Sequence, residues 1–167
     1  MPEIIGPSYS WSEIVCFIWY RKLAALATVS RSGEPRVDPL IYASDEKYIY
    51  ICPIPKTRKL QFLRQNNKVA VTIFDAYNED WSRIGSIIIR GEAQFVDRHS
   101  EEYEMVVSLY KAKYPQVIRR GAAILMDQKQ VPMIKINLDK AKISTGALHV
   151  PTDNEMLAIM DKHKING

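Results

Sequence analysis

The chain has 167 residues, of which 47% are apolar and 25% are charged, a composition typical of one globular domain of ordinary size. Lysine and arginine total 23 against 19 for aspartate and glutamate, and this net charge of +4 is too small for the clustered basic face of a nucleic-acid-binding protein. No apolar run is long enough to span a membrane, no secretory signal is evident, and Cys16 and Cys52 have no zinc-ligand spacing, so we expect a cytoplasmic protein with two buried thiols.

The sequence of the first half of the chain predicts a helix followed by a meander of three strands. A capping box of Ser10 and Glu13 opens the helix, after which apolar residues recur at helical spacing. Strand-like runs joined by short polar turns follow it. The expected elements are a helix at 10–22 and strands at 23–30, 36–44 and 48–54. Pro53 and Pro55 end the meander, and Thr57 is the expected N-cap of a second helix over 57–66.

The second half predicts two longer strands, a helix and a final pair of strands. Gly91, in the second long strand, predicts a bend or a bulge where the backbone can come close to another part of the molecule. The expected elements are strands at 68–76 and 83–97, a helix at 100–115 with Tyr103, Val106, Val107 and Tyr110 on one face, two strands within 131–144, and a closing helix at 152–164 with a second capping box, Thr152 and Glu155. Residues 116–128 fit either a helix or a loop.

These elements predict a mainly β (α+β) fold, a small antiparallel barrel of about six strands with peripheral helices. We expect residues 1–167 to form a single domain with its core at about 20–144. The sequence has no glycine-rich loop of the dinucleotide-binding or nucleotide-binding type.

Few residues suggest a catalytic or metal site. His99, His149 and His163 are far apart in the sequence and have no carboxylate or cysteine at ligand spacing. No signature of a serine or cysteine nucleophile is present, and the acidic residues before Trp81 are typical of a solvated turn. We therefore assign no metal and no catalytic residue.

Cations at the start of the second predicted helix are the most informative feature. Arg58 and Lys59 fall in its first turn, where they oppose the helix dipole and add to the positive field of the free backbone N–H groups. The meander would bring Arg36 near Lys56 and this turn, where Thr57 adds a hydroxyl. Such groups suit the binding of a phosphate monoester. The alternative interpretation is that these cations belong to a solvated surface helix that binds no ligand. Without a ligand, these cations would repel one another.

Several short motifs occur in the order typical of a known family. A glycine turn at Gly33 follows the first strand, Arg36 lies on the second, and Thr57, Arg58 and Lys59 precede the segment LRQNNKV. Over residues 20–144 the chain resembles the FMN-binding split-barrel family related to pyridoxamine 5'-phosphate oxidase. The resemblance implies a split antiparallel barrel and a homodimer with two equivalent cofactor sites at its interface.

The same resemblance implies a flavin-dependent oxidoreductase that acts on a small organic substrate. The implied FMN-binding residues are Arg36, Val37, Ile51, Cys52, Lys56, Thr57, Arg58 and Lys59. Within this set Arg36, Arg58 and Lys59 would hold the FMN phosphate, with Thr57 assisting. The backbone around Ile51 and Cys52 would line the isoalloxazine ring.

The sequence departs from true pyridoxamine 5'-phosphate oxidases near its end. No tryptophan follows Trp81, and the Arg-Leu-x-Pro segment that helps those enzymes bind their substrate is missing, so we do not expect vitamin B6 oxidation. A deazaflavin (coenzyme F-420)-dependent reductase and a non-catalytic flavin- or haem-binding protein remain alternatives. Arg119 and Arg120 are candidates either for a substrate entrance or for solvated surface.

The predicted closing helix has an apolar face. Met156, Leu157, Ile159 and Met160 form more apolar surface than a solvated tail would carry. We expect this face to pack on the barrel or on the partner subunit of a homodimer.

Overall fold

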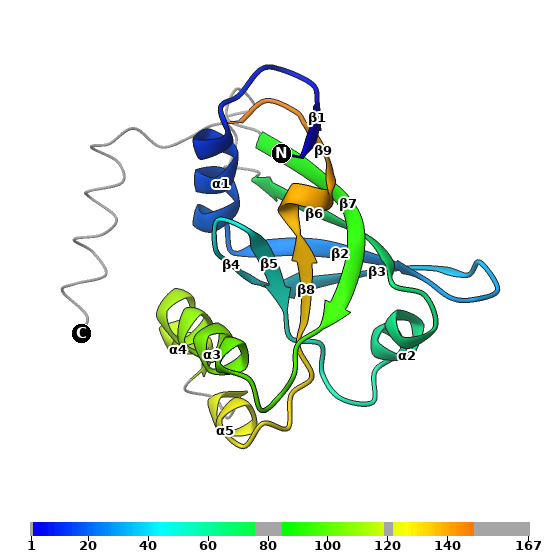
Figure 1. Ribbon diagram of the computed structural model, residues 1–167, viewed down its shortest axis with the longest axis vertical. Helices are drawn as coiled ribbons and strands as arrows, with labels where there is room; N and C mark the ends of the chain where they lie inside the picture. Colours follow the sequence, from blue (N-terminus) through cyan, green and yellow to red (C-terminus); the bar gives the residue numbers. More distant parts are fainter. Residues whose placement is uncertain (1, 76–84, 119–121, 149–167) are drawn as a thin grey trace.

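The computed structural model describes residues 2–75, 85–118 and 122–148. Nine strands in these ranges form one curled sheet in the order β3-β2-β6-β7-β8-β5-β4, with β9 paired to β7 and β1 paired to β9 (Figure 1). The strands are β1 (Glu3–Ile5), β2 (Leu23–Val29), β3 (Pro35–Ile41), β4 (Ala43–Ser44), β5 (Tyr48–Ile51), β6 (Lys68–Asp75), β7 (Gly85–Phe95), β8 (Ile134–Asn137) and β9 (Lys142–Thr145), and the helices are α1 (Trp11–Tyr20), α2 (Arg58–Gln65), α3 (Glu101–Lys113), α4 (Pro115–Ile118) and α5 (Ala122–Asp127). The fold is a mainly β split barrel, as the sequence predicts.

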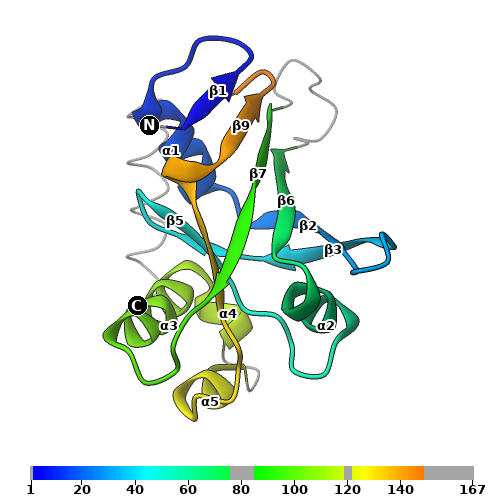
Figure 2. The same cartoon turned by 45° about the vertical axis from the view of Figure 1, so that its right-hand side comes forward.

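The long strand β7 joins the two halves of the barrel. One edge pairs with β6 from Gly85 to Glu92, while the other edge pairs first with β9 and then with β8 (Figure 2). Gly91 lies between the residues that pair with β9 and those that pair with β8. A Cβ atom at Gly91 would lie 3.2 Å from Cγ2 of Ile136, so the predicted close approach at this glycine is confirmed.

Helix α1 closes the interior of the barrel. Its predicted capping box is present, because the Ser10 hydroxyl accepts from the Glu13 N–H and the Glu13 carboxylate accepts from the Ser10 N–H. The face formed by Ile14, Phe17 and Ile18 is fully buried against the apolar residues that β2, β6 and β7 point inward. Apart from the hydroxyl group of Tyr42, which donates to the Ile18 carbonyl, this core is apolar, so its stability comes mainly from the burial of hydrocarbon.

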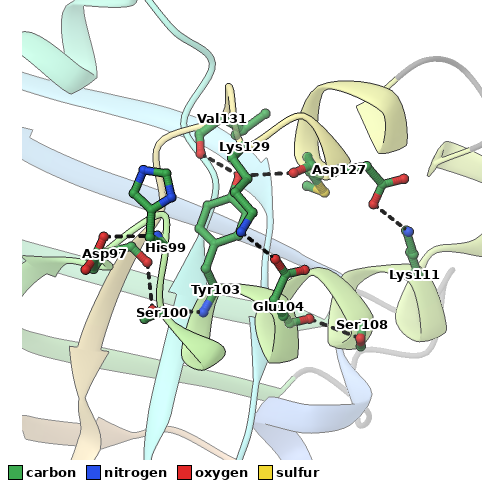
Figure 3. Close-up of polar contacts among 11 residues, drawn as sticks. Asp97, His99, Ser100, Tyr103, Glu104, Ser108, Lys111, Asp127, Lys129 and Val131 are labelled. Atoms are coloured by element: carbon green, nitrogen blue, oxygen red, sulfur yellow. Dashed lines mark hydrogen bonds and ion pairs between the residues drawn. The ribbon is translucent and has the colours of Figure 1, made fainter.

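A second core lies between α3 and the outer side of β4, β5 and β8, and it is rich in tyrosine. The predicted apolar face of α3 is buried, and the hydroxyl groups of Tyr103, Tyr110 and Tyr114 donate to carbonyl oxygens of distant segments at 3.0, 2.9 and 2.6 Å. Figure 3 shows this layer at Tyr103, together with the ion pairs that join α3 to the following segment, Lys111 with Asp127 and Lys129 with Glu104. Buried hydroxyl groups need such partners, and here they fix α3 to the sheet.

The structure differs from the sequence prediction in three places, and it decides a fourth region that the sequence left open. The expected strand 36–44 is divided at the fully buried Tyr42, because β3 pairs with β2 whereas β4 pairs with β5 in the other half of the barrel. The short edge strand β1 was not expected, and the ambiguous region 116–128 contains the helices α4 and α5. The two last strands do not pair with each other, since a 3₁₀ helix at Leu138–Lys140 separates them.

The expected helix at 152–164, with Thr152 and Glu155, lies outside the described residues. Among the helices that the structure describes, none has the length and apolar character needed to cross a membrane.

Candidate functional site

A turn at Gly33 lets β2 and β3 form the hairpin that carries the first site residue. Gly33 has a φ of +88°, a left-handed conformation that glycine adopts without strain. The turn is closed by hydrogen bonds from Gly33 N–H to the Ser30 carbonyl (3.1 Å) and from Ser30 N–H to the Glu34 carbonyl (2.9 Å). Because side chains alternate along a strand, Arg36 and Asp38 then share one face of β3.

Asp38 is the anion at the centre of the site. Its carboxylate accepts two hydrogen bonds of 2.8 Å, from Nε and Nη2 of Arg36, and Nζ of Lys59 lies 3.6 Å from its Oδ1. The side chains of Asp38 and Lys59 are 12% and 13% exposed, whereas that of Arg36 is 38% exposed. The hydrogen bonds from Arg36 lower the pKa of Asp38 against the opposing effect of burial, and the carboxylate raises the pKa of Arg36. Asp38 therefore stays ionised at neutral pH and fixes the orientation of the guanidinium.

Arg58 and Lys56 lie nearer to the solvent. Nη1 of Arg58 is 3.9 Å from Oε1 of Glu34, and both side chains are largely exposed, so this pair contributes little to stability. Lys56 forms no ion pair with any residue in the described ranges, and its φ of +64° is a left-handed conformation. Such a conformation is uncommon for a residue with a side chain and is often found at binding sites.

The first turn of α2 has no side-chain cap. Thr57 is the N-cap residue, as predicted, but its hydroxyl donates to the Ile54 carbonyl at 2.8 Å and accepts no bond from the helix. The turn contains no acidic residue. Free backbone N–H groups and the neighbouring cations Arg58 and Lys59 therefore produce a positive field at this end of the helix. The arrangement suits a phosphate or a similar dianion.

The other three predicted residues lie on β5, directly after β5 and on β3. The Ile51 side chain is buried in the barrel core, and the Cys52 thiol packs against the tyrosine-rich core, where burial raises its pKa to about 12. Only the main chain at Ile51 and Cys52 is therefore available to a ligand. Val37 lies on the opposite face of β3 from Arg36, and it is 65% exposed.

The structure corrects one expectation about this site, namely that its cations repel one another when no ligand is bound. Arg36 and Lys59 share Asp38, and Arg58 faces Glu34. Sequence reasoning considered only the cations and missed Asp38. The signal was present, since an arginine and an aspartate two positions apart in a strand lie on one face and can pair.

Several other candidates fall outside the site or outside the described residues. His99 lies in the turn before α3, where its backbone N–H donates to the Asp97 carboxylate (Figure 3). Within the described ranges, no group of histidine, cysteine or acidic side chains is arranged to hold a metal ion. The residues not described include Trp81, Arg119, Arg120, His149, His163, Met156, Leu157, Ile159 and Met160.

Solved structures with the same fold come from several bacteria. A conserved hypothetical protein of Mycobacterium tuberculosis, Rv2991, is 18% identical with a TM-score of 0.66, over 88% of this chain and 95% of its own. HutZ, the haem storage protein of Vibrio cholerae, is 20% identical with a TM-score of 0.59, over 79% of this chain and 91% of its own. An FAD-binding protein of Mesorhizobium loti is 16% identical with a TM-score of 0.63, over 83% of this chain and 96% of its own. Identities this low show that the fold is shared, and they carry no information about which ligand this chain binds.

No curated protein matches the chain significantly. A sequence model of the family described as pyridoxamine 5'-phosphate oxidase matches residues 10–143. This range contains the Gly33 turn, the Arg36–Asp38 pair and the whole of α2. The chain therefore belongs to the pyridoxamine 5'-phosphate oxidase family.

Proposed function

We propose that this chain binds FMN, with the phosphate at the N-terminus of α2, and that it is a flavin-dependent oxidoreductase acting on a small organic substrate. The observation that carries the proposal is the first turn of α2, which has no side-chain cap and no acidic residue but has Arg58 and Lys59. A dianion there gains both from the free N–H groups and from the helix dipole. FMN, when bound, supplies the hydride or electron transfer, so the chain need supply only binding and orientation.

Asp38 is suited to hold the cations of this site in place before a phosphate binds. The Arg36 guanidinium has five N–H groups, and two of them donate to Asp38. The remaining N–H groups are free for phosphate oxygens, as are donors of Lys59, whose Nζ is 3.6 Å from Asp38. A guanidinium already held in one orientation loses less conformational freedom when it binds. Asp38 would therefore act as a positioning residue for the cations.

We also propose that the protein is a homodimer, formed through the outer face of the sheet beside this site. Neighbouring strands present an apolar surface there, whose most exposed side chains are Leu23 (61%), Val37 (65%), Phe74 (50%) and Ile88 (41%). Small residues of β2 and β6 lie between them, for example Ala27 opposite both Val37 and Ala70. Apolar surfaces of this kind are typical of protein interfaces. Because Val37 is next to Arg36, the partner subunit would lie beside the phosphate site.

Sedimentation analysis tests the dimer. The substitution Phe74→Glu places a charge in the middle of this face and should convert the dimer to a monomer at micromolar concentration. Met105→Glu is the control, because Met105 is a partly exposed apolar residue of α3 in the tyrosine-rich half of the molecule. A wild-type chain that sediments as a monomer would contradict the proposal.

Deazaflavin and haem remain the alternative ligands. The haem alternative is supported by the fold shared with HutZ, which is described as a haem storage protein. It receives no support from His99, which lies in the turn before α3 and away from the cationic site. An absorption spectrum of the purified protein separates the alternatives, because flavin and haem have distinct bands. We expect flavin bands to stay with the protein after FMN is added and the unbound flavin is removed by gel filtration. Protein that keeps no flavin but shows a Soret band would contradict the proposal.

A further inference from the structure

A groove of about 590 Å³ lies along α1, and none of its lining residues belongs to the cationic site. Its walls include Trp11, Val15 and Trp19 of α1, Leu109 of α3, and the acidic turn of Asp45 and Glu46 between β4 and β5. We propose that residues 152–164 of this same chain dock in this groove as an amphipathic helix. This α1 groove is separate from the proposed FMN site and from the proposed dimer face.

The α1 groove has the surface that an apolar helix face needs. Trp11, Val15 and Trp19 are four residues apart, so they form one stripe along α1. The opposite face of α1, at Ile14 and Phe17, is already buried in the barrel. Trp19 is 50% exposed, and a stripe that exposes tryptophan in this way is typical of a docking surface.

The path of the chain leads directly to this groove. Leu148 is the last described residue, and its backbone N–H donates to the hydroxyl of Tyr9 at 2.9 Å. Tyr9 is two positions before Trp11, so the chain leaves the barrel at the N-terminal end of α1. Residue 152 follows only four positions later, within roughly 14 Å of Leu148. A helix over 152–164 would be about 20 Å long, against about 15 Å for the ten residues of α1.

The pattern of residues 152–164 matches the α1 groove in polarity and charge. Met156, Leu157, Ile159 and Met160 form its apolar face, and Lys162 and Lys164 lie near its end. A helix that starts beside Trp11 and runs along α1 carries these lysines toward the β4–β5 turn, which lies near the C-terminal half of α1 (Figures 1 and 2). There Glu46 forms no ion pair with any described residue, whereas Asp45 already accepts bonds from Lys47 and Tyr48. Glu46 is therefore the natural partner for the basic end.

Cys16 also lines the α1 groove and allows a disulfide test in the full-length chain. In a Cys52→Ala background Cys16 is the only thiol, and single cysteines are then introduced by Met156→Cys, Leu157→Cys or Met160→Cys. Ala158→Cys is the matched control, because residue 158 falls on the opposite face of a helix from these three. Mild oxidation should join Cys16 to at least one of the three apolar positions within one chain, and at least five times faster than to position 158. Peptide mass spectrometry identifies the pair.

Three outcomes would overturn the proposal. A disulfide that joins two chains would show that the segment of a second copy occupies the α1 groove. Equal rates at position 158 and at the apolar positions would show that no defined face is docked. The third outcome combines two results: no disulfide forms, and a thiol reagent labels Cys16 at the same rate in Leu157→Asp as in Ala158→Asp. Together they would show that the α1 groove is open. The proposal predicts that Leu157→Asp raises that labelling rate at least threefold, while Ala158→Asp leaves it unchanged.

Discussion

Two buried charged groups, the carboxylate of Asp38 and the ammonium group of Lys113, have opposite surroundings. Asp38 accepts two hydrogen bonds from Arg36 and lies 3.6 Å from Lys59, so its pKa is lowered and its charged form is favoured. The Nζ of Lys113 is buried with no hydrogen-bond partner among the described residues, and it lies 3.9 Å from the centre of the Tyr42 ring. Burial, with a smaller contribution from Lys22, lowers the pKa of Lys113 to about 7, so its charged form is disfavoured.

Asp38 is therefore a charge that its surroundings stabilise, whereas Lys113 is a charge that its surroundings destabilise. At the cationic site each buried charge has a partner of opposite sign, and the exposed cations are left for a ligand. At Lys113 the ammonium group has no hydrogen-bond partner among the described residues and lies near only the ring faces of Tyr42 and Tyr114. A ring face attracts a cation but replaces only part of its lost hydration. Lys113 should therefore reduce stability at neutral pH, whereas Asp38 should increase it.

The largest expected effect is a gain in stability from Lys113→Met. Because the pKa of Lys113 is about 7 in the folded protein and about 10.4 in an unfolded chain, the unfolded state binds more protons between these values, and stability rises with pH there. Below pH 7 the substitution should raise the free energy of unfolding by on the order of 3 kcal/mol, after allowance for the lost contact with Tyr42. Chemical denaturation at pH 6 and pH 10 checks this.

The gain from Lys113→Met should shrink as the pH rises from 7 toward 10. Lys111→Met is the control, since Lys111 is half-exposed on the same helix and pairs with Asp127 at 2.7 Å, so its removal should change stability by less than about 1 kcal/mol. A destabilised Lys113→Met variant at pH 6 would show that the ammonium has a favourable partner.

The next largest effect is a loss of stability from Asp38→Asn. The neutral amide cannot hold Arg36 and Lys59 as the carboxylate does, and we expect a loss of about 2 kcal/mol at pH 7. The folded pKa of Asp38 is below its unfolded value, so its contribution is present above about pH 4 and is lost as the pH falls through the folded pKa. The deficit of the variant, measured by denaturation, should therefore shrink below pH 4.

Glu34→Gln is the matched control for Asp38→Asn. It removes the other carboxylate of the site, but this carboxylate is largely exposed and 3.9 Å from Arg58, so its loss should be within about 0.5 kcal/mol. Equal losses from the two variants would contradict the distinction between a buried pair and an exposed one.

The smallest stability effect should come from Arg58→Ala. Its side chain is 70% exposed, so the apoprotein should unfold within about 0.5 kcal/mol of wild type. Arg36→Ala should destabilise the apoprotein more than Arg58→Ala, because it leaves the buried Asp38 with Lys59 alone. Thermal denaturation of the two ligand-free variants measures this order, and the reverse order would contradict it.

Sequence patterns predicted most elements of the fold because the patterns are local. The capping box at Ser10 and the buried face of α3 each depend on a few neighbouring residues. The division of strand 36–44 at Tyr42 was not predicted, because it depends on pairing with β5 in the other half of the barrel. Strand β1 was missed because it has three residues and pairs with β9, at the far end of the described chain.

At the candidate site, the sequence predicted the cations but not their mutual arrangement. Arg36, Arg58 and Lys59 do gather around the start of α2, yet they differ in exposure and in partner. Those differences depend on how α2 packs beside the β2–β3 hairpin, which no short motif specifies. Lys113 was not singled out at all, since a lysine near a helix C-terminus is ordinarily a favourable surface charge.

The central claim is that the N-terminus of α2 binds a phosphate group, and titrating FMN and riboflavin into apoprotein tests it most directly. Wild type should bind FMN much more tightly than riboflavin, which lacks the phosphate. Arg58→Ala should weaken FMN binding by about 10-fold, or 1.4 kcal/mol, and leave riboflavin binding unchanged. Arg64→Ala is the control, because Arg64 lies in the last turn of the same helix, and it should change neither affinity. Equal affinities for FMN and riboflavin in wild type and both variants would contradict the claim.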